Sequence, residues 1–399
     1  MTEGPYTLPK GWRWVRLGDV AQIYAGSSAP QGEQYFRGGK WPFVRVQDLG
    51  RYGQTTCLKE TANYVNEYAL QKYRLRLAKA GTILFPKSGA AILTNSRAIL
   101  GVDAYIVSHL AAVEPLPDKL DTYWAYFWLC TVDMKEFIDN PSYPSLRLSE
   151  VSKLLIPLPP LEEQRRIVAR IEELLGRVRE ARRLREEAKN DAERLWQAIL
   201  AQTFPRPGSE LPEGWRWAKL GEVSEIIMGQ SPPSKSYNTE GKGLPFFQGK
   251  ADFGDLYPIP RVWCGDPKKI AHAGDILISV RAPVGPTNMA AEDCCIGRGL
   301  AALRPRNGID PFWVLFYLRS IEGVIAVMGT GSTFNAITKK ELEALFIPLP
   351  PLEEQRRIVA HLQEVQEKIK ALEEAQEQTE AELKRLEQAI LEKAFRGEL

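Results

Sequence analysis

The sequence predicts an α+β protein in which two pseudo-symmetric α/β units are separated by a pair of long antiparallel coiled-coil helices. Residues 8–20 (LPKGWRWVRLGDV) and 211–223 (LPEGWRWAKLGEV) are two copies of one segment, and IPLPPLEEQRRIV occurs at both 156–168 and 347–359. A long charged stretch with heptad spacing follows each copy of the second segment. Two units and two arms in one chain predict approximate two-fold symmetry, which suits a partner such as duplex DNA.

The two arms have the spacing of coiled-coil helices. The prolines of each PLPP segment end the secondary-structure element that precedes them. The first helix can therefore begin at Leu161 and run to about Phe204, before Pro205. Apolar residues alternate steps of four and three along both arms. The predicted seams are Ile167, Ile171, Leu174, Val178, Ala181, Arg185, Ala188, Ala192, Leu195 and Ile199, and Ile358, Leu362, Val365, Ile369, Leu372, Gln376, Thr379, Leu383, Leu386 and Ile390. Antiparallel packing would bring the polar positions Arg185 and Gln376 close together.

The globular units contain short strands and a few helices. Residues 82–85 and 275–280 are predicted to be buried strands that follow glycine turns, and residues 121–131 and 310–320 amphipathic helices. The Trp-rich segments at 8–20 and 211–223 predict a turn that leads into a short strand. We expect a first unit at 1–155, a first coiled-coil helix at 156–204, a second unit at 205–346 and a second helix at 347–399.

Composition favours a soluble cytoplasmic protein without bound metal. The chain has 399 residues, of which 44% are apolar and 26% charged, and its net charge of +2 neither favours nor excludes nucleic acid. We find no signal peptide and no apolar run of membrane-spanning length. Five cysteines without a C-x-x-C and three histidines predict free thiols rather than a metal site.

Catalytic motifs are weak. No phosphate-binding G-x-x-x-x-G-K-[ST] loop occurs, and the segment at 140–143, NPSY, lacks the second proline of a methyltransferase N-P-P-Y loop. Asp118, Asp133 and Lys135 formally fit a nuclease pattern, but Glu322 and Val324 replace the last two in the second copy. We therefore interpret Asp118 as a turn residue and Asp133 as a helix-end residue, and we predict no catalytic residue.

The repeated segments resemble those of the specificity (S) subunits of Type I restriction–modification systems over nearly the whole chain. These subunits share an opening L-P-x-G-W, a variable target recognition domain, a P-L-P-P-L-x-E-Q-R boundary and a long helix, followed by the same set again. The segments RLWQAIL at 194–200 and RLEQAIL at 385–391 also fit. One departure is NPSYPSLRLSEV in the first unit, where the second unit keeps GSTFNAI at 331–337.

This resemblance implies a division of labour in a larger complex. Each target recognition domain would read one half of a bipartite asymmetric site in double-stranded DNA. The helices would set the spacing and dock two methyltransferase (M) subunits, and restriction–translocase (R) subunits would join. S-adenosylmethionine, ATP and Mg would belong to those partners, which leaves this chain non-catalytic and without a membrane partner. The alternatives are a related specificity subunit serving a fused cleavage–methylation (Type IIB-like) enzyme and a coiled-coil scaffold that does not bind DNA.

Base reading requires polar side chains in loops between strands, with Arg suited to guanine and Asn or Gln to adenine. The DNA-binding candidates are Arg45, Gln47, Lys87, Ser88, Asn95, Arg97, Tyr143, Arg147, Gln248, Lys250, Arg281, Asn288, Arg298, Ser332, Thr333 and Asn335. A phosphate contact or a solvated side chain is an equally good interpretation of each. The partner-binding candidates are Glu162, Gln164, Arg165, Arg166, Glu353, Gln355, Arg356 and Arg357. Their alternative role is pairing along a solvated helix face.

Overall fold

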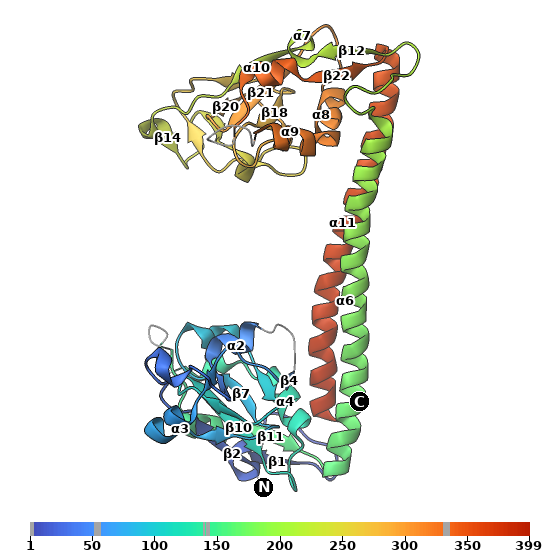
Figure 1. Ribbon diagram of the computed structural model, residues 1–399. Helices are drawn as coiled ribbons and strands as arrows, with labels where there is room; N and C mark the ends of the chain where they lie inside the picture. Colours follow the sequence, from blue (N-terminus) through green and yellow to red (C-terminus); the bar gives the residue numbers. More distant parts are fainter. Residues whose placement is uncertain (1–3, 52–56, 139, 141–143, 330–335) are drawn as a thin grey trace. The chain divides into compact units, whose positions relative to one another are not determined.

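The computed structural model describes residues 4–51, 57–138, 140, 144–329 and 336–399. The chain forms two compact units (Figure 1). Unit 1 comprises Met1–Leu184 and Gln378–Leu399, and unit 2 comprises Arg185–Glu377. Each unit therefore contains a globular part and a segment of both long helices, α6 (Leu161–Thr203) and α11 (Leu352–Arg396).

Unit 1 contains two mixed sheets. The first has the order β2-β10-β7-β8-β4, with strands Ala21–Ala25, Leu110–Pro115, Ile83–Pro86, Ala98–Leu100 and Cys57–Leu58. The second has the order β5-β3-β9-β6, with strands Tyr64–Val65, Trp41–Val44, Ala104–Ile106 and Leu77–Ala78. The pairs β3–β9 and β4–β8 are parallel. The short helices are α1 (Leu17–Val20), α2 (Val46–Arg51), α3 (Glu67–Tyr73), α4 (Thr122–Thr131), α5 (Leu148–Lys153), η1 (Glu33–Tyr35), η2 (Ala90–Thr94) and η3 (Met134–Phe137).

Unit 2 repeats this plan. One sheet has the order β13-β21-β18-β19, with strands Ser224–Met228, Leu300–Pro305, Ile276–Ser279 and Thr287–Met289. The other has the order β14-β16-β15-β20-β17, with strands Tyr237–Asn238, Trp263–Cys264, Leu244–Phe247, Cys294–Ile296 and Ile270–Ala271. As in unit 1, the strand after the first loop, β15, runs parallel to its neighbour β20. The short helices are α7 (Leu220–Val223), α8 (Pro311–Ser320), α9 (Glu322–Gly329), α10 (Lys339–Ala344), η4 (Ser234–Ser236) and η5 (Lys250–Asp252).

The helices α4 and α8 form the centre of each core. They occupy the predicted ranges, but the prediction that they are amphipathic is wrong. All six residues from Trp313 to Leu318 in α8 are buried, and α4 has a single exposed residue, Thr131. A sheet covers one side of each helix and a long arm approaches the other, so no side is left for a polar face.

A two-stranded sheet joins each globular part to its arm. Strand β1 (Arg13–Arg16) pairs antiparallel with β11 (Leu155–Leu158), and β12 (Arg216–Lys219) pairs in the same way with β22 (Phe346–Leu349). The indole N–H of Trp124 donates to the carbonyl of Pro157 (3.0 Å), and that of Trp313 donates to Pro348 (2.9 Å). The two repeated sequence motifs are therefore strand partners, which explains why both recur together.

The arms pack antiparallel in each unit. In unit 1 the early residues of α6 share a core with the late residues of α11, and Arg182 forms two hydrogen bonds with Glu387 (2.7 and 2.9 Å). In unit 2 the late residues of α6 share a core with the early residues of α11. Arg185 Nε donates to the side-chain oxygen of Gln376 at 3.2 Å. The predicted meeting of these two polar positions is confirmed.

The predicted seam is wrong at Leu372, which is 40% exposed, and at two equivalent positions near the helix ends. Leu195 and Leu386 were expected to face the other helix, yet they are 55% and 49% exposed. Each helix end instead turns a different face inward, because it packs against the apolar helix of a globular part. Phe204 lies 4.8 Å from Trp313 and Phe395 lies 4.7 Å from Trp124, measured between ring centroids.

No single described helix is long and apolar enough to cross a membrane, although α8 and α9, bent by 68°, meet the length and composition test as a pair. Within the same part of the chain, no group of three or more His, Cys, Asp or Glu side chains is arranged to hold a metal ion.

Candidate nucleic-acid interface and helix faces

Three chain segments meet at one edge of unit 1, each at the end of a strand. The N–H of Val107, which follows β9, donates to the carbonyl of Val44 at the end of β3 (3.0 Å). The N–H of Lys87, which follows β7, donates to the carbonyl of His109 in the β9–β10 turn (2.9 Å). These bonds bring the candidates Arg45 and Lys87 to the same edge as the β9–β10 turn.

Another candidate joins this edge from a distant part of the chain. Ser88 forms an isolated β-bridge with Ser145, two residues before the exposed Arg147. The Ser88 hydroxyl lies 2.6 Å from Nδ1 of His109, which is itself exposed. Lys87, Ser88 and Arg147 are thus brought together at one edge.

His109 is a polar residue of this edge that sequence reasoning missed. It lies one residue before β10, in the turn whose counterpart in unit 2, between β20 and β21, carries the candidate Arg298. The signal that could have found it was the repeat itself, because β10 and β21 occupy the same place in their sheets. Alignment of the two turns would have identified both His109 and Arg298 as candidates.

The same edge exists in unit 2. The N–H of Gly297, in the β20–β21 turn, donates to the carbonyl of Phe247 at the end of β15 (2.8 Å). The N–H of Val280, which follows β18, donates to the carbonyl of Gly299 in the same turn (2.9 Å). Gln248 follows β15, Arg281 follows β18 and Arg298 lies in the turn, and all three are exposed. Lys250, also exposed, begins η5 beside them.

A carboxylate shapes the first loop of each edge. Asp48 Oδ2 accepts the backbone N–H of Arg45 at 2.7 Å, and Asp252 Oδ2 accepts that of Gln248 at 2.6 Å. Asp48 is fully buried, so its role is to fix the loop. A close backbone approach adds to this in unit 2, because a Cβ at Gly299 would lie 2.1 Å from the Gln248 carbonyl oxygen.

Aromatic packing restricts the side chain of Arg45. Its guanidinium carbon lies 5.2 Å from the ring centroid of Phe36 and 5.9 Å from that of Phe43. Such cation–π contacts hold a guanidinium plane in place. The neighbouring Gln47 is exposed and projects from helix α2.

Three candidates have internal partners instead of an open surface. Arg97 is 9% exposed and donates to the carbonyls of Asn95 (2.6 Å) and Val132 (2.6 Å), and burial lowers the pKa of its guanidinium. Asn95 is half-buried, with its side-chain oxygen accepting from Arg97 (3.0 Å). Asn288 is fully buried and donates to the carbonyl of Gly254 (2.9 Å). We therefore leave these three out of the reading surface.

Four further candidates lie outside the described residues: Tyr143, Ser332, Thr333 and Asn335. The segments that flank them nevertheless reach the two edges. Ala336 forms an isolated β-bridge with Arg281, as Ser145 does with Ser88 in unit 1.

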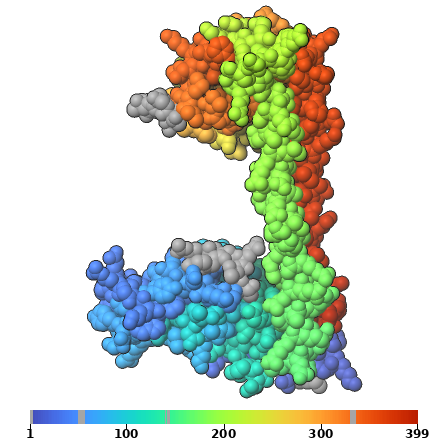
Figure 2. Space-filling view, turned by 45° about the vertical axis from the view of Figure 1, so that its right-hand side comes forward, coloured from blue at the N-terminus to red at the C-terminus, as the bar shows by residue number. Residues whose placement is uncertain are grey.

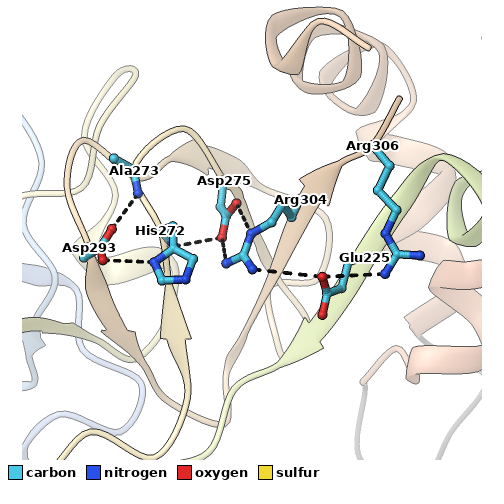
Figure 3. A network of polar contacts seen from close by, with 7 residues as sticks. All are labelled: Glu225, His272, Ala273, Asp275, Asp293, Arg304 and Arg306. Carbon is cyan, nitrogen blue, oxygen red and sulfur yellow. Dashed lines mark hydrogen bonds and ion pairs between the residues drawn. The ribbon is translucent and has the colours of Figure 1, made fainter. Parts of the chain in front are cut away.

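A polar network lies at the start of β18, opposite the end that leads to the edge of unit 2 (Figure 3). Asp275, at the start of β18, forms two hydrogen bonds with Arg304 of β21 (3.0 and 2.8 Å). Its carboxylate also accepts the backbone N–H of His272 (2.8 Å). Asp293 contacts the His272 ring (2.9 Å), and that hydrogen bond lowers the pKa of Asp293. The network fixes β18, whose far end leads to Arg281.

The partner-binding candidates divide into exposed and buried residues. Glu162, Arg165, Glu353 and Arg356 are exposed, as are Arg166 and Arg357. Arg166 pairs with Glu163 (2.7 Å), and Arg357 pairs with Glu354 (3.3 Å). Both pairs are largely solvated, and pairs of that kind hold a side chain weakly. The exposed residues therefore remain available to a partner.

The two glutamines do not belong with them. Gln164 is fully buried, and its amide accepts the N–H of Asp121 (2.8 Å) and donates to the carbonyls of Lys119 (3.0 Å) and Pro159 (2.9 Å). Gln355 is 4% exposed and donates to the carbonyl of Pro350 (3.0 Å). Both were predicted to bind a partner, and the structure shows instead that they lock the start of each arm to its globular part.

The two similar units each carry one equivalent polar edge, an arrangement typical of proteins that bind a target at two places. The model of the Type I restriction modification DNA specificity domain matches residues 9–189 and 212–383, and the chain belongs to this family. It is a specificity subunit of a type I restriction–modification system, and its function is DNA recognition.

Relatives support this assignment along the whole chain. A solved chain from work on complex assembly and conformational transition of the type I R-M system is 47% identical and covers 99% of this chain and 100% of its own, with a TM-score of 0.83. The HsdS subunit from Thermoanaerobacter tengcongensis is also 47% identical, covers 100% of each chain and has a TM-score of 0.63. The type I restriction enzyme EcoBI specificity subunit of Escherichia coli is 26% identical and covers 99% of this chain and 88% of its own.

Proposed function

We propose that each unit reads one half of a bipartite, asymmetric site in double-stranded DNA through the edge described above. The observation that carries this proposal is that one backbone frame presents different side chains in the two units. Arg45 and Gln248 occupy the same place, each held by an aspartate that accepts its N–H. Ser88 and Arg281 also correspond. Ser88 forms a β-bridge with Ser145, just before α5, and Arg281 forms one with Ala336, just before α10.

These differences are of the kind that distinguish bases. Arg pairs with guanine through two hydrogen bonds, whereas Gln pairs with adenine. A fixed frame with exchanged side chains would therefore read two different half-sites. The proposed reading residues are Arg45, Gln47, Lys87, Ser88, His109, Arg147, Gln248, Lys250, Arg281 and Arg298.

The wider assembly is part of the same proposal. The arms set the spacing of the half-sites, and two methyltransferase subunits bind at the exposed residues of the arms. Restriction–translocase subunits then join this complex. The chain is non-catalytic and acts in the cytoplasm, while S-adenosylmethionine, ATP and Mg are bound by the partners. Support comes from the repeated exposed residues Glu162, Arg165, Glu353 and Arg356, since two copies of one surface suit two identical subunits.

Methylation of a randomised duplex library by the reconstituted methyltransferase complex tests the reading surface. Arg45→Gln should change base preference in one half-site only, and Gln248→Arg in the other only. Loss of a bidentate base contact costs about 1–3 kcal/mol, which corresponds to roughly 5- to 150-fold in discrimination. Arg216→Gln, on the exposed surface of β12, is the matched control and should leave both half-sites unchanged.

A coarser exchange tests whether the units read independently. Replacing residues 21–150 with the matching segment of another specificity subunit should alter one half-site. If both half-sites changed, or if Arg45→Gln and Arg216→Gln had equal effects, the proposed reading surface would be wrong. The two earlier alternatives make other predictions: a scaffold would bind no duplex at any salt concentration, and a subunit of a fused enzyme would purify with a single cleavage–methylation polypeptide.

A further inference from the structure

Unit 2 carries a short hairpin at residues 252–259. The N–H of Gly254 donates to the carbonyl of Tyr257 (3.1 Å), which closes the tip of the hairpin. The N–H of Ile259 donates to the carbonyl of Asp252 (2.8 Å), which joins its two ends. We call this segment the 252–259 hairpin.

The hairpin exposes two large apolar side chains. Tyr257 is 44% exposed and Ile259 is 52% exposed. Figure 2 shows this part of unit 2, drawn in yellow, at the surface. Single exposed apolar residues are common on proteins, so exposure alone assigns no role. Here two basic residues that flank the hairpin in sequence, Lys250 and Arg261, are also exposed, which suits a polyanionic ligand.

The body of unit 2 holds the hairpin in place through its backbone. The amide of Asn288, which is fully buried in β19, donates to the carbonyl of Gly254 (2.9 Å). The guanidinium of Arg319, in α8, donates to the carbonyl of Asp255 (2.7 Å). A loop that is fixed in this way loses little conformational freedom when a ligand binds, which favours affinity. Asn288, which was expected to read a base, therefore positions the hairpin.

The hairpin is continuous with the polar edge of unit 2. The carboxylate of Asp252 accepts the N–H of Gln248 (2.6 Å) and that of Gly249 (3.3 Å). The backbone carbonyl of the same aspartate accepts the N–H of Ile259 (2.8 Å). One residue therefore connects Ile259 to the proposed reading residue Gln248, and the two are neighbours on the same part of the unit.

The two units differ at the position of Ile259. The carbonyls of Val262 and Asn63 accept the N–H of equivalent phenylalanines in β15 and β3 (2.8 and 2.9 Å), and this shared bond aligns the segments that follow the two edges. Three residues before the shared bond stand Ile259 in unit 2 and Glu60 in unit 1, and both are exposed. An apolar side chain thus replaces a carboxylate at one surface position of a common frame, a difference that core packing does not explain.

We infer that Ile259 contacts the 5-methyl group of a thymine in the half-site that unit 2 reads. This inference rests on the proposed function, which supplies the DNA. Thymine is the one base that presents a methyl group in the major groove, and an apolar side chain is suited to contact it. A protein partner is the other possible occupant of an exposed isoleucine. The place beside Gln248 and between two basic residues favours DNA, because its phosphates attract those residues.

Replacement of thymine by deoxyuridine, which lacks only the 5-methyl group, tests this contact in the reconstituted methyltransferase complex. The half-site that persists when residues 21–150 are exchanged is that of unit 2. Each thymine of this half-site is replaced in turn, and binding of each duplex is measured. For the wild-type chain one replacement should raise the dissociation constant about 4-fold, the value of one buried methyl group. Ile259→Ala should weaken binding to the thymine duplex and remove this difference.

Two further variants sharpen the test. Phe346→Ala, the matched control, truncates another exposed apolar residue of unit 2, in β22, and should keep the wild-type difference. Ile259→Glu copies the residue of unit 1 and should disfavour thymine at the same position. A carboxylate gains nothing from a methyl group and accepts instead from the amino group of cytosine. Because both positions are exposed, unchanged thermal unfolding of the variants excludes misfolding as the cause.

Each outcome decides the inference. A half-site of unit 2 without thymine, or a wild-type chain indifferent to every deoxyuridine, would overturn it. So would an Ile259→Ala variant that keeps the wild-type difference, or a Phe346→Ala variant that loses it equally. Reduced co-purification of the methyltransferase with Ile259→Ala, together with unchanged discrimination, would assign the isoleucine to a protein contact. Failure of the proposed function is distinguishable, because Gln248→Arg would then leave both half-sites unchanged.

Discussion

Replacement of Gln164 by alanine should destabilise unit 1 without acting directly on a partner. Its amide accepts one backbone N–H, from Asp121 at the start of α4, and donates to two carbonyls, of Lys119 and Pro159. These bonds connect the first turn of the arm with the first turn of the central helix. Because the side chain is fully buried, alanine would leave three polar groups without their partner.

The expected loss follows from these three groups. An unsatisfied buried polar group costs about 1–3 kcal/mol, and carbonyls with a second acceptor position lie at the low end. Water that enters the vacated space would restore part of the loss. We expect a decrease of about 3 kcal/mol in the free energy of unfolding of unit 1. Gln355→Ala should cost unit 2 less, about 2 kcal/mol, because its bond to the Asp310 N–H is long, at 3.4 Å.

Hydrogen exchange measured by mass spectrometry resolves the two units. Exchange of amides in residues 119–131 should accelerate about 100-fold in Gln164→Ala, which corresponds to about 3 kcal/mol, while residues 310–320 should be little affected. Gln197→Ala, an exposed glutamine of the same helix, is the control and should change stability by less than about 0.5 kcal/mol. Normal exchange in Gln164→Ala together with lost partner binding would refute this reasoning and restore the original prediction.

Three further predictions concern spacing, assembly and acid stability. Deleting one heptad from both arms should change the gap between the methylated half-sites but not the half-sites themselves, and a variant that kept the original gap would show that the arms do not set it. Charge reversal of four exposed arginines should reduce co-purification of the methyltransferase more than DNA binding by the free chain, whereas full retention of partner would assign them to solvated pairs; the four are Arg165, Arg166, Arg356 and Arg357. The lowered pKa of Asp293 means that its carboxylate stabilises unit 2 above its ordinary pKa and that this contribution is lost as pH falls through the lower, folded-state pKa. The stability difference between wild type and Asp293→Asn should therefore be present at pH 7 and shrink below about pH 4, and a pH-independent difference would contradict the assignment.

The periodic and repeated parts of this protein were determined by the sequence. The ranges of both long helices, their antiparallel packing and the contact between Arg185 and Gln376 follow from heptad spacing and from a constant offset between two copies. The central strand of each unit and the helices α4 and α8 were also predictable, since apolar runs and glycine turns are local signals. Local signals specify an element but not what covers it, which is why α4 and α8 proved buried on all sides.

Tertiary structure decided which polar and apolar side chains reach the surface. Arg97 and Asn288 have the chemistry of base-reading residues, but neighbouring segments supply their hydrogen-bond partners and bury them. Gln164 lies in the most polar part of its motif, yet it is buried and bonds to Lys119 and Asp121, in the segment that leads into α4. Leu195 fits the heptad, yet it faces solvent because the end of α6 directs Trp196 and Phe204 toward α8. In each case the deciding contact comes from residues distant in sequence, and spacing along one segment carries no information about them.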